Sequence, residues 1–511
     1  MSSTSIPRNY NAAVDLIERN LLAGRKDKPA YIDDAGTYTY AELDARVNRA
    51  ANALVALGIR REERVALALL DTIDFPAAFL GAIKAGIVPV ALNTLLTTPD
   101  YEYMLRDCRA QALVVSEPLL KVFAPLLGKL PDLKHVIVSG RDAQGQVSFS
   151  ALLEKAGTTF APADTLADEI CFWLYSSGST GAPKGTVHLH SHLILTADLY
   201  AVPVLGIRES DVVFSAAKLF FAYGLGNALT FPLAVGATTV LMAERPTPDA
   251  VFRRLVEHKP TVFYGVPTLY AAMLVSENFP PRDKLALRVG TSAGEALPPE
   301  ILKRFAERTG VELLDGIGST EMLHIFISNR PGDVKPGTTG KAVPGYTLRL
   351  VDESGQEVKP GELGELEISG PTAAIMYWNQ RDKTKKTFEG AWTKSGDKYT
   401  QIEGGYYAYG GRSDDMLKVG GIYVSPAEVE AALVSHPAIL ECAVVGHEDA
   451  DKLVKPKAFV VLKPGAKATD EELKAHVKSA LAHYKYPRWV EFVAELPKTA
   501  TGKIQRFKLR G

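Results

Sequence analysis

Short apolar runs alternate with amphipathic helical segments along most of this 511-residue chain. One such pair is RVALALL (64–70) followed by DFPAAFLGAIKAG (74–86), and another is PTVFYGV (260–266) followed by PTLYAAMLVSE (267–277). Because strands that alternate with helices pack as βα units, the pattern predicts mostly parallel sheet. The chain is too long for one compact core, so at least two domains are expected.

The pattern changes twice in the second half of the chain. From about Lys341 to Ile402 it consists of short strands and glycine turns, most clearly in GELGELEISG (361–370). After GGRSDDMLKVGG (410–421) charged helical segments return, among them SPAEVEAALVSHP (425–437). We therefore expect a large N-terminal domain of mixed α/β class over residues 1–412 and a small C-terminal domain over residues 413–511.

The composition is that of an ordinary soluble globular protein, with 46% hydrophobic and 23% charged residues. A formal net charge of -1 offers no field for nucleic acid or an anionic membrane. Cys108, Cys171 and Cys442 are far apart and match no metal-ligand spacing, so buried, inert thiols in a reducing compartment are expected. The first residues, MSSTSIPRNYNAAVDL, contain no signal-peptide pattern, and the cytoplasm is the expected location.

One stretch, Leu219 to Met242, contains no charged residue and is long enough to span a bilayer. However, Gly224, Pro232 and Gly236 interrupt it, and its end, ATTVLM, has the β-branched character of a strand. A buried helix followed by a core strand is therefore expected in place of a membrane span.

The stretch YSSGSTGAPKG (175–185) follows an apolar run and combines glycines, hydroxyl side chains and one lysine. Glycines let backbone N–H groups converge on an anion, hydroxyls add donors, and Lys184 adds a positive charge, which is typical of a phosphate site. It is not a Walker A loop, because Pro183 stands where the second glycine must be and TVHLH (186–190) predicts a strand. A glycine-rich surface hairpin without a ligand remains the alternative for this segment taken alone.

Six further motifs follow the loop in order: SAGEALP (292–298), DGIGSTE (315–321), GELGELEISG (361–370), WTKSGDKY (392–399), GGRSDDMLKVGGIYVSPAEVE (410–430) and PKTATGKIQR (497–506). Together the seven resemble the signature motifs of the adenylate-forming superfamily, which includes acyl-CoA synthetases, firefly luciferase and peptide-synthetase adenylation domains. The resemblance covers nearly the whole chain. It implies a multi-subdomain N-terminal domain with parallel-rich sheets and a β-barrel-like part, followed by a small, mobile α+β C-terminal domain.

The resemblance implies ATP-dependent activation of an acid. A carboxylate attacks the α-phosphate, giving an acyl-adenylate and pyrophosphate, and the acyl group then passes to the thiol of coenzyme A. Because one anion attacks another, catalysis must come mainly from neutralising and orienting charge. By the same resemblance Glu321 matches a Mg²⁺ ligand and Thr320 lies beside the phosphates. The β and γ phosphates would be held by Ser176, Ser177, Gly178, Thr180 and Lys184.

The resemblance also assigns a site for adenosine. Asp397 matches the residue that accepts both ribose hydroxyls, and Arg412 also reaches the ribose. Ile317 is a departure, since many members carry an aromatic residue there, and its contact with adenine would be apolar without a ring. The remaining adenine contacts would come from the side chain of Asp315, the adjacent Gly316, and the backbone of Gly294 and Glu295.

Two C-terminal motifs imply a moving domain. Lys503 matches the lysine that bridges the substrate carboxylate and the α-phosphate during adenylation, and Asp414 matches the hinge. Rotation about this hinge would withdraw Lys503 and present Lys418, Gly420 and Gly421 to the pantetheine arm of coenzyme A. Glycines suit that position because an arm passing close to the backbone leaves no room for a Cβ.

The segments LFFAYGLGN (219–227) and GSTEMLHIF (318–326) bracket the acyl pocket of the resembled enzymes. The slot that they could form is flat and mainly apolar. It has no Arg or Lys to pair with a second carboxylate of a substrate and no acidic group to pair with the ammonium of an amino acid. Many relatives have a histidine near Tyr223, and this chain lacks it. The pocket most resembles that of benzoate-CoA ligases, with His324 facing a ring substituent such as an ortho amino group. The slot residues are Phe220, Phe221, Ala222, Tyr223, Gly224 and His324.

Other functions stay open at this point. A CoA ligase for another small aromatic, alicyclic or medium-chain acid is the nearest alternative, and a nucleotide-binding module without catalysis is the more distant one. The cluster HLHSH (188–192) puts His188 and His190 on one face of a strand, yet no acidic or cysteine ligand accompanies them, so a zinc site is not expected. We expect a monomer or a homodimer.

Overall fold

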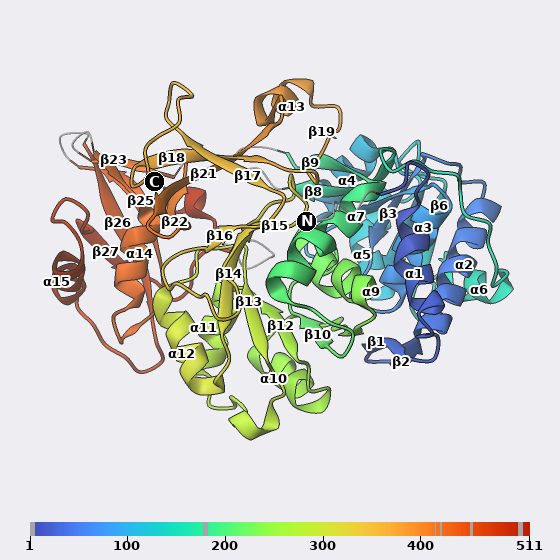
Figure 1. The fold of residues 1–511 in the computed structure, drawn as a ribbon, viewed down its shortest axis with the longest axis horizontal. Coiled ribbons are helices and arrows are strands. Elements are labelled where there is room, and N and C mark those ends of the chain that lie inside the picture. Colours follow the sequence, from blue (N-terminus) through green and yellow to red (C-terminus); the bar gives the residue numbers. More distant parts are fainter. Residues whose placement is uncertain are drawn as a thin grey trace.

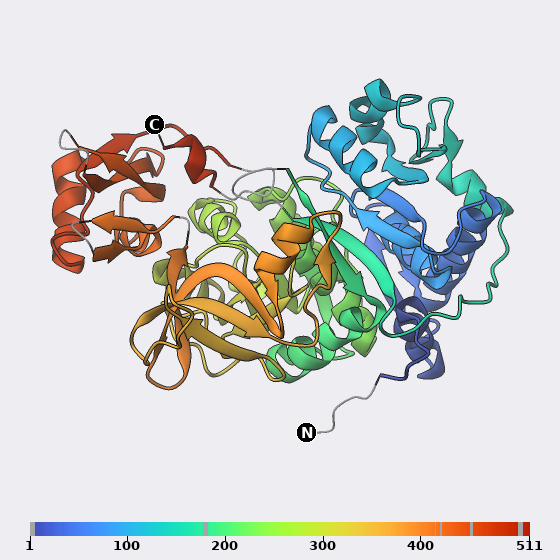
Figure 2. The ribbon, with the colours of Figure 1, turned by 90° about the horizontal axis from the view of Figure 1, so that it is seen from above.

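The computed structural model describes residues 6–176, 182–413, 415–419, 422–449, 453–498 and 504–510, and of Lys418, Ile422 and Tyr423 it describes the backbone. The described strands form sheets of nine, eight, five, three and two members. The eight-stranded sheet lies at one end of the molecule and the last strands of the chain lie at the other, with the nine-stranded sheet between them (Figures 1 and 2).

The eight-stranded sheet carries the first βα units. Its order is β19-β9-β8-β4-β3-β5-β6-β7, with parallel pairs from β8 to β7 and antiparallel pairs between β8, β9 and β19. The strands are β3 (Arg64–Ala68), β4 (Val88–Ala91), β5 (Ala112–Ser116), β6 (His135–Ser139), β7 (Val147–Ser148), β8 (Ile170–Ser176), β9 (Lys184–Leu189) and β19 (Met376–Tyr377). The helices between them are α3 (Asp74–Lys84), α4 (Thr98–Cys108), η1 (Glu117–Leu119), α5 (Leu120–Phe123), η2 (Ala124–Leu126) and α6 (Phe149–Lys155).

The nine-stranded sheet has the order β16-β15-β14-β13-β12-β10-β11-β1-β2. Its six central strands pair in parallel, and β2, β15 and β16 are antiparallel at the edges. The strands are β1 (Pro29–Asp33), β2 (Gly36–Thr39), β10 (Val212–Ser215), β11 (Thr238–Val240), β12 (Val262–Gly265), β13 (Val289–Ser292), β14 (Leu313–Gly318), β15 (Ile325–Ser328) and β16 (Lys341–Ala342). The prediction of parallel βα units is confirmed in both large sheets.

Several helices belong to this part of the chain. They are α1 (Ala12–Leu22), α2 (Tyr40–Ala56), α7 (His190–Thr196), the π-helix η3 (Ala197–Leu205), α10 (Pro248–Glu257), α11 (Pro267–Val275), η5 (Arg282–Lys284) and α12 (Pro299–Thr309). Helix α1 begins as its sequence indicates, because the side chain of Asn11 accepts hydrogen bonds from the N–H groups of Ala13 and Val14.

The uncharged stretch 219–242 is not one continuous helix. It contains one helical run made of α8 (Ala222–Leu225), the π-helix η4 (Gly226–Thr230) and α9 (Phe231–Val235), and then β11, an interior strand of the nine-stranded sheet. The expected buried helix followed by a core strand is therefore confirmed. Within the part of the chain that the structure describes, no helix has the length and apolarity needed to cross a bilayer.

The change of pattern near Lys341 corresponds to an antiparallel sheet of five strands. These are β17 (Thr347–Val351), β18 (Leu363–Ser369), β20 (Phe388–Glu389), β21 (Trp392–Ile402) and β22 (Tyr406–Arg412), with α13 (Arg381–Thr387) before β20. After it come β23 (Leu417–Val419), β24 (Ile422–Val424), α14 (Pro426–Val434), β25 (Ile439–Glu448), β26 (Val454–Leu462), α15 (Asp470–Ala480), β27 (Trp489–Phe492) and η6 (Arg506–Lys508). The C-terminal elements pack around apolar clusters of their own, which include Val429, Val460 and Leu473.

The two large sheets share one apolar core. Buried side chains of both contribute to it, for example Leu67 of β3 and Tyr264 of β12, and Leu16 of α1 and Phe79 of α3 pack into the same cluster. Because protein interiors are close-packed, this shared core fixes the loops of one sheet relative to those of the other. All three cysteines are buried and free, as predicted, and burial raises the pKa of the Cys108 thiol to about 12.

Candidate functional site

The glycine-rich loop connects two antiparallel strands, as the sequence predicts. Strands β8 and β9 pair with Ser176 opposite Lys184, so the loop closes a hairpin whose last two paired residues are themselves candidate phosphate ligands. Ser177, Gly178 and Thr180 lie outside the described residues. A strand after the loop, in place of a helix, agrees with the exclusion of a Walker A site.

The turn between β14 and β15 brings Glu321 to this hairpin. Oε1 of Glu321 accepts a hydrogen bond from Oγ of Ser176 at 3.2 Å and lies 3.7 Å from Nζ of Lys184. Burial lowers the pKa of Lys184, Glu321 opposes that shift, and the nearby cations Lys383 and Arg412 add to it. Clustered cations beside a carboxylate suit a polyphosphate with a divalent metal ion.

Tyr377 joins these groups, and our sequence reasoning did not select it. Its hydroxyl donates to Oε1 of Glu321 at 2.7 Å and accepts from Nζ of Lys184 at 3.1 Å, while the same ammonium lies 4.2 Å from the centre of the ring. Tyr377 reaches the site because β19 pairs with β9, with Tyr377 opposite Thr186. The available signal was the pair Met376–Tyr377, separated by five residues from the end of the GELGELEISG motif, which is consistent with a short strand.

The backbone of Thr320 is held by a buried histidine. Nε2 of His188 lies 2.8 Å from the carbonyl oxygen of Thr320, and Nδ1 of His188 lies 3.0 Å from Nδ1 of His192. The expectation that His188 and His190 share a strand face is wrong, because β9 ends at Leu189 and His190 begins α7. The helical turn carries His192 back towards His188.

The turn that carries Thr320 and Glu321 is tight. Leu323 has a φ of 65°, an unusual value for a large side chain, and its N–H bonds the Thr320 carbonyl at 3.2 Å. A Cβ on Gly318 would lie 2.6 Å from the backbone of His324, so only glycine fits there. Strained backbone of this kind is typical of functional sites.

The candidate adenine residues lie at the carboxyl ends of β13 and β14. Gly294 is exposed with a φ of 93°, Glu295 is half-buried, and Ser292 pairs with Asp315 across the two parallel strands. Oδ1 of Asp315 is buried without a hydrogen-bond partner among the described residues, and burial raises the pKa of that carboxyl. An acceptor in this state fits an exocyclic amino group. Gly316 and the half-buried Ile317 follow on the same strand.

The two candidate ribose residues are neighbours across a strand pair. Asp397 of β21 stands opposite Arg412 of β22, and Nη1 of Arg412 lies 3.4 Å from Oδ1 of Asp397. Gly396 has a φ of 72°, and a Cβ there would lie 2.9 Å from Nη2 of Arg412. The glycine in WTKSGDKY thus lets the arginine approach the carboxylate.

Most of the C-terminal candidates cannot be placed. Asp414, Gly420, Gly421 and Lys503 lie outside the described residues, and Lys418 is described only as the middle residue of β23, opposite Tyr423 of β24.

The acyl-pocket candidates come together. His324 is 2% exposed, and its ring contacts those of Tyr223, Tyr200 and Phe231 at centroid distances of 5.7, 5.6 and 4.5 Å. The hydroxyl of Tyr223 lies 2.6 Å from Oγ1 of Thr291. Phe220 is 4% exposed and packs into the core against Phe221.

His324 is buried, and one of its ring nitrogens has no hydrogen-bond partner in the part of the chain that the structure describes. Its Nε2 lies 3.2 Å from the carbonyl oxygen of Tyr223, and its Nδ1 has no partner among the described residues. Burial lowers the pKa of His324 to about 3. A neutral imidazole with a free ring nitrogen offers one polar contact in an otherwise apolar wall.

Two family descriptions match the chain. They are the AMP-binding enzyme, over residues 18–378, and the AMP-binding enzyme C-terminal domain, over residues 428–503. The chain is 65% identical over 510 residues to the benzoate–CoA ligase of Thauera aromatica. The aligned region covers 99% of this chain and 96% of that protein.

Two solved structures resemble the fold throughout. A benzoate CoA ligase from Burkholderia xenovorans LB400 superposes with a TM-score of 0.93 at 57% identity, covering 98% of this chain and 100% of that one. An anthranilate CoA ligase in complex with anthranoyl-AMP superposes with a TM-score of 0.96 at 46% identity, covering 100% of this chain and 98% of that one.

Proposed function

Because this chain belongs to the AMP-binding enzyme family, we propose that it is an AMP-forming acid–thiol ligase that converts benzoate, ATP and coenzyme A into benzoyl-CoA, AMP and pyrophosphate. The family match confirms the resemblance carried by the seven motifs. The observation that carries the proposal is the meeting of Lys184 and Glu321, 3.7 Å apart beside the β8–β9 hairpin. A triphosphate with its metal ion requires just such a cation and a carboxylate.

The residues of the hairpin and the β14–β15 turn bind the phosphates. Ser176 and Lys184, with the loop between them, hold the β and γ phosphates and draw charge away from the α-phosphate. Glu321 would hold Mg²⁺, whose charge offsets that of the phosphate oxygens, and the neighbouring Thr320 lies beside the phosphates. This arrangement lowers the repulsion that a benzoate carboxylate meets as it approaches the α-phosphorus.

The nucleoside is bound between two sheets. The unpartnered Oδ1 of Asp315 supports an acceptor role towards the adenine amino group, and the pairing of Asp397 with Arg412 supports a role at the ribose. Gly294, Glu295, Gly316 and Ile317 form the remaining adenine walls. The apolar face of Ile317 takes the place of an aromatic ring.

The C-terminal elements serve both half-reactions. Lys503 bridges the carboxylate and the α-phosphate during adenylation, and rotation about Asp414 then replaces it with Lys418, Gly420 and Gly421 for thiol attack. The domain boundary falls between residues 412 and 413. The family match to residues 428–503 supports a separate C-terminal unit. We place the enzyme in the cytoplasm, as a monomer or homodimer.

The acid is held in the slot of Ala222, Tyr223, Gly224 and His324. Its walls carry no formal charge, in agreement with a neutral aromatic ring as substrate. The relative with 65% identity is named for benzoate, which is our first choice of acid. The free Nδ1 of His324 favours 2-aminobenzoate as a second candidate, and a structural neighbour binds anthranoyl-AMP.

The test is ATP–pyrophosphate exchange with benzoate, 2-aminobenzoate, 4-hydroxybenzoate, cyclohexanecarboxylate and hexanoate, followed by mass detection of each CoA thioester. We expect exchange with aromatic acids, benzoate first, and a thioester only when CoA is added. If hexanoate is the best acid, the aromatic slot is wrong while the ligase assignment stands. Absence of exchange with every acid would contradict the enzyme assignment.

A further inference from the structure

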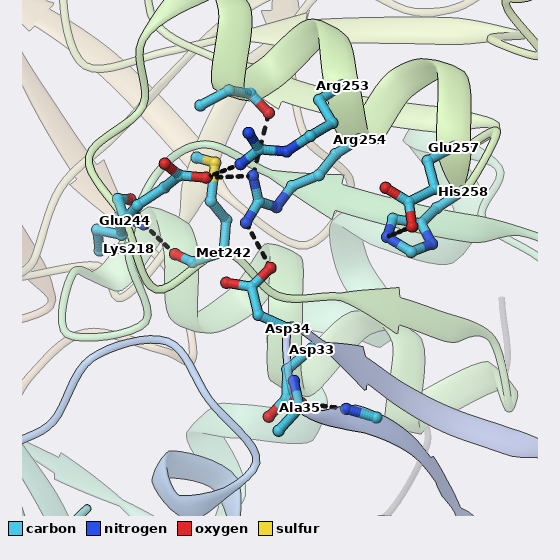
Figure 3. A network of polar contacts seen from close by, with 12 residues as sticks. Asp33, Asp34, Ala35, Lys218, Met242, Glu244, Arg253, Arg254, Glu257 and His258 are labelled. Carbon is cyan, nitrogen blue, oxygen red and sulfur yellow. Dashed lines mark hydrogen bonds and ion pairs between the residues drawn. The ribbon is translucent and has the colours of Figure 1, made fainter.

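The acyl-pocket segment is fixed from the nine-stranded sheet by a charge network around the buried Arg254. Residues 217–224 leave the carboxyl end of β10, and Nζ of Lys218 donates to the carbonyl oxygens of Met242 and Glu244, which follow β11 (Figure 3). The side chain of Glu244 accepts from Arg254 at 2.6 Å, and Arg254, only 2% exposed, also binds Asp34 after β1. The network therefore anchors Lys218 to two neighbouring strands of its own sheet.

A second contact reaches the same segment from the other large sheet. Asp71 follows β3 and is 2% exposed, and its Oδ1 accepts the N–H of Leu219 at 3.2 Å. Burial raises the pKa of Asp71 to about 6, while Lys218 and the Leu219 N–H oppose that shift. A buried carboxylate is costly unless it is paired, and here the Leu219 N–H and the charge of Lys218 offset that cost.

The segment transmits its position directly to the slot. Phe221 N–H bonds the carbonyl of Lys218 at 3.0 Å, and a Cβ on Gly224 would lie 2.0 Å from that same oxygen. Gly224 therefore packs directly on the Lys218 backbone. Ala222 and Tyr223 lie between these two contacts, so a displacement of Lys218 or Leu219 moves the slot wall with it.

We propose that Asp71 is a positioning residue that sets the acid selectivity of the slot through the backbone N–H of Leu219, although it belongs to the loop after β3 and lies outside the slot itself. Lys218 acts with it from the opposite side. The inference rests on the proposed function, because it takes the 220–224 segment as the acid-binding wall. It adds a determinant of selectivity in the loop that follows β3, a strand of the other large sheet.

The substitutions separate the hydrogen-bond acceptor from the charge. Asp71→Asn keeps an acceptor oxygen in the same place, whereas Asp71→Leu keeps the approximate volume and leaves the Leu219 N–H without a partner. The measurement is kcat/KM for benzoate, 2-aminobenzoate and hexanoate, together with KM for ATP. A methylene-sized change in a pocket alters selectivity roughly 10- to 200-fold.

For Asp71→Leu we expect the benzoate-to-hexanoate and benzoate-to-2-aminobenzoate ratios of kcat/KM to change by about 10-fold or more. The KM for ATP should stay within about twofold, because the ATP residues lie on other segments. Asp71→Asn should keep both ratios within about threefold of the parent values. Three results would each overturn the proposal. The ratios could be unchanged in Asp71→Leu, the KM values for acid and ATP could rise equally in that variant, or Asp71→Asn could alter the ratios as much as Asp71→Leu does.

A second pair keeps the test decisive if Asp71→Leu does not fold. Lys218→Met removes the donor to the Met242 and Glu244 carbonyls, whereas Lys218→Arg keeps N–H donors on a long side chain. Lys218→Met should alter the two kcat/KM ratios, and Lys218→Arg should keep them close to the parent values. Ratios that are unaltered in both variants would overturn the proposal. A parent enzyme that makes no benzoyl-CoA would instead contradict the proposed function, and the ratios are then taken relative to its best acid.

Discussion

Tyr377 donates its phenolic hydrogen to Oε1 of Glu321 across 2.7 Å, although 56 positions separate the two residues in sequence. The same hydroxyl oxygen accepts a hydrogen bond from Lys184. One neutral side chain thus holds the proposed metal-binding carboxylate and the proposed phosphate-binding ammonium in a fixed relationship. Burial and the charge of Glu321 raise the pKa of Tyr377, so the phenol keeps its proton at working pH.

Removal of this hydroxyl should weaken ATP binding more than acid binding. A hydrogen bond to a charged group contributes about 1.5–3 kcal/mol, so Tyr377→Phe should raise KM for ATP by about 10-fold or more. The KM for benzoate should change little, because Tyr377 does not contact the slot residues. Steady-state kinetics at several Mg²⁺ concentrations measure both constants. Tyr407→Phe on β22, whose hydroxyl has a weak contact with Gln401 at 3.4 Å, is the matched control. An unchanged KM for ATP in Tyr377→Phe would contradict the assignment.

His188 should act through the Thr320 carbonyl. His188→Leu leaves that buried oxygen without its side-chain donor, and a lost donor in a preorganised site costs on the order of 10²-fold in kcat. His188→Gln can still donate through its amide N–H and should recover most of the loss. Adenylation is followed by pyrophosphate exchange with saturating benzoate. If the Gln and Leu variants are equally impaired, the hydrogen bond to Thr320 is not what matters at this position.

Local sequence patterns predict much of the fold because strand and helix signals are short in range. The βα units, the hairpin closed by the glycine-rich loop, and the burial of residues 219–242 all follow from the order of apolar and polar residues within a few turns. Motif spacing likewise brings Lys184, Glu321, Asp397 and Arg412 to the site. Lys184, Asp397 and Arg412 lie on β9, β21 and β22, and Glu321 lies in the turn between β14 and β15.

Long-range pairing could not be predicted in the same way. Tyr377 joins the candidate phosphate residues because a two-residue strand pairs with β9 across more than a third of the chain, and Asp71 reaches Leu219 because two sheets share a core. Neither contact leaves a periodic signal in the sequence. The error over His190 has a local cause, since β9 ends one residue earlier than the alternation of HLHSH suggests. Boundaries of elements are set by such competition between strand and helix.

Lys503 should separate the two half-reactions. Because we assign Lys503 to adenylation alone, Lys503→Ala should lower acyl-adenylate formation by about 10² or more, which corresponds to roughly 3 kcal/mol of transition-state stabilisation. Transfer from supplied benzoyl-adenylate to CoA should be retained. Gly421→Leu provides the opposite case, because a side chain in the proposed pantetheine path should block transfer and leave adenylation intact. Equal loss of both steps in either variant would refute the two-state assignment.

The buried histidines should make the enzyme sensitive to acid. Burial lowers the pKa of His188 and His190 to about 4 and that of His324 to about 3, whereas an unfolded histidine titrates near 6.5. Below pH 6.5 the unfolded chain therefore binds protons that the folded chain does not, and stability falls as the pH falls towards the folded values. The raised pKa of Asp71, about 6, acts in the opposite direction, because that carboxyl gains its proton earlier in the folded state.

A difference between variants isolates one histidine from these opposing groups. His188→Gln removes a single titrating site and leaves Asp71 unchanged, so any contribution from the carboxyl cancels in the comparison. Each such histidine contributes a slope of about 1.4 kcal/mol per pH unit well below pH 6.5. Between pH 6.5 and 5 the parent should thus lose about 1.5 kcal/mol more than the variant. The fall in Tm over this interval, followed by near-UV circular dichroism, should be smaller for His188→Gln. If the Tm of both proteins falls by the same amount between pH 6.5 and 5, His188 is not held neutral in the folded enzyme. Its proposed N–H donation to Thr320 must then be assigned to an imidazolium.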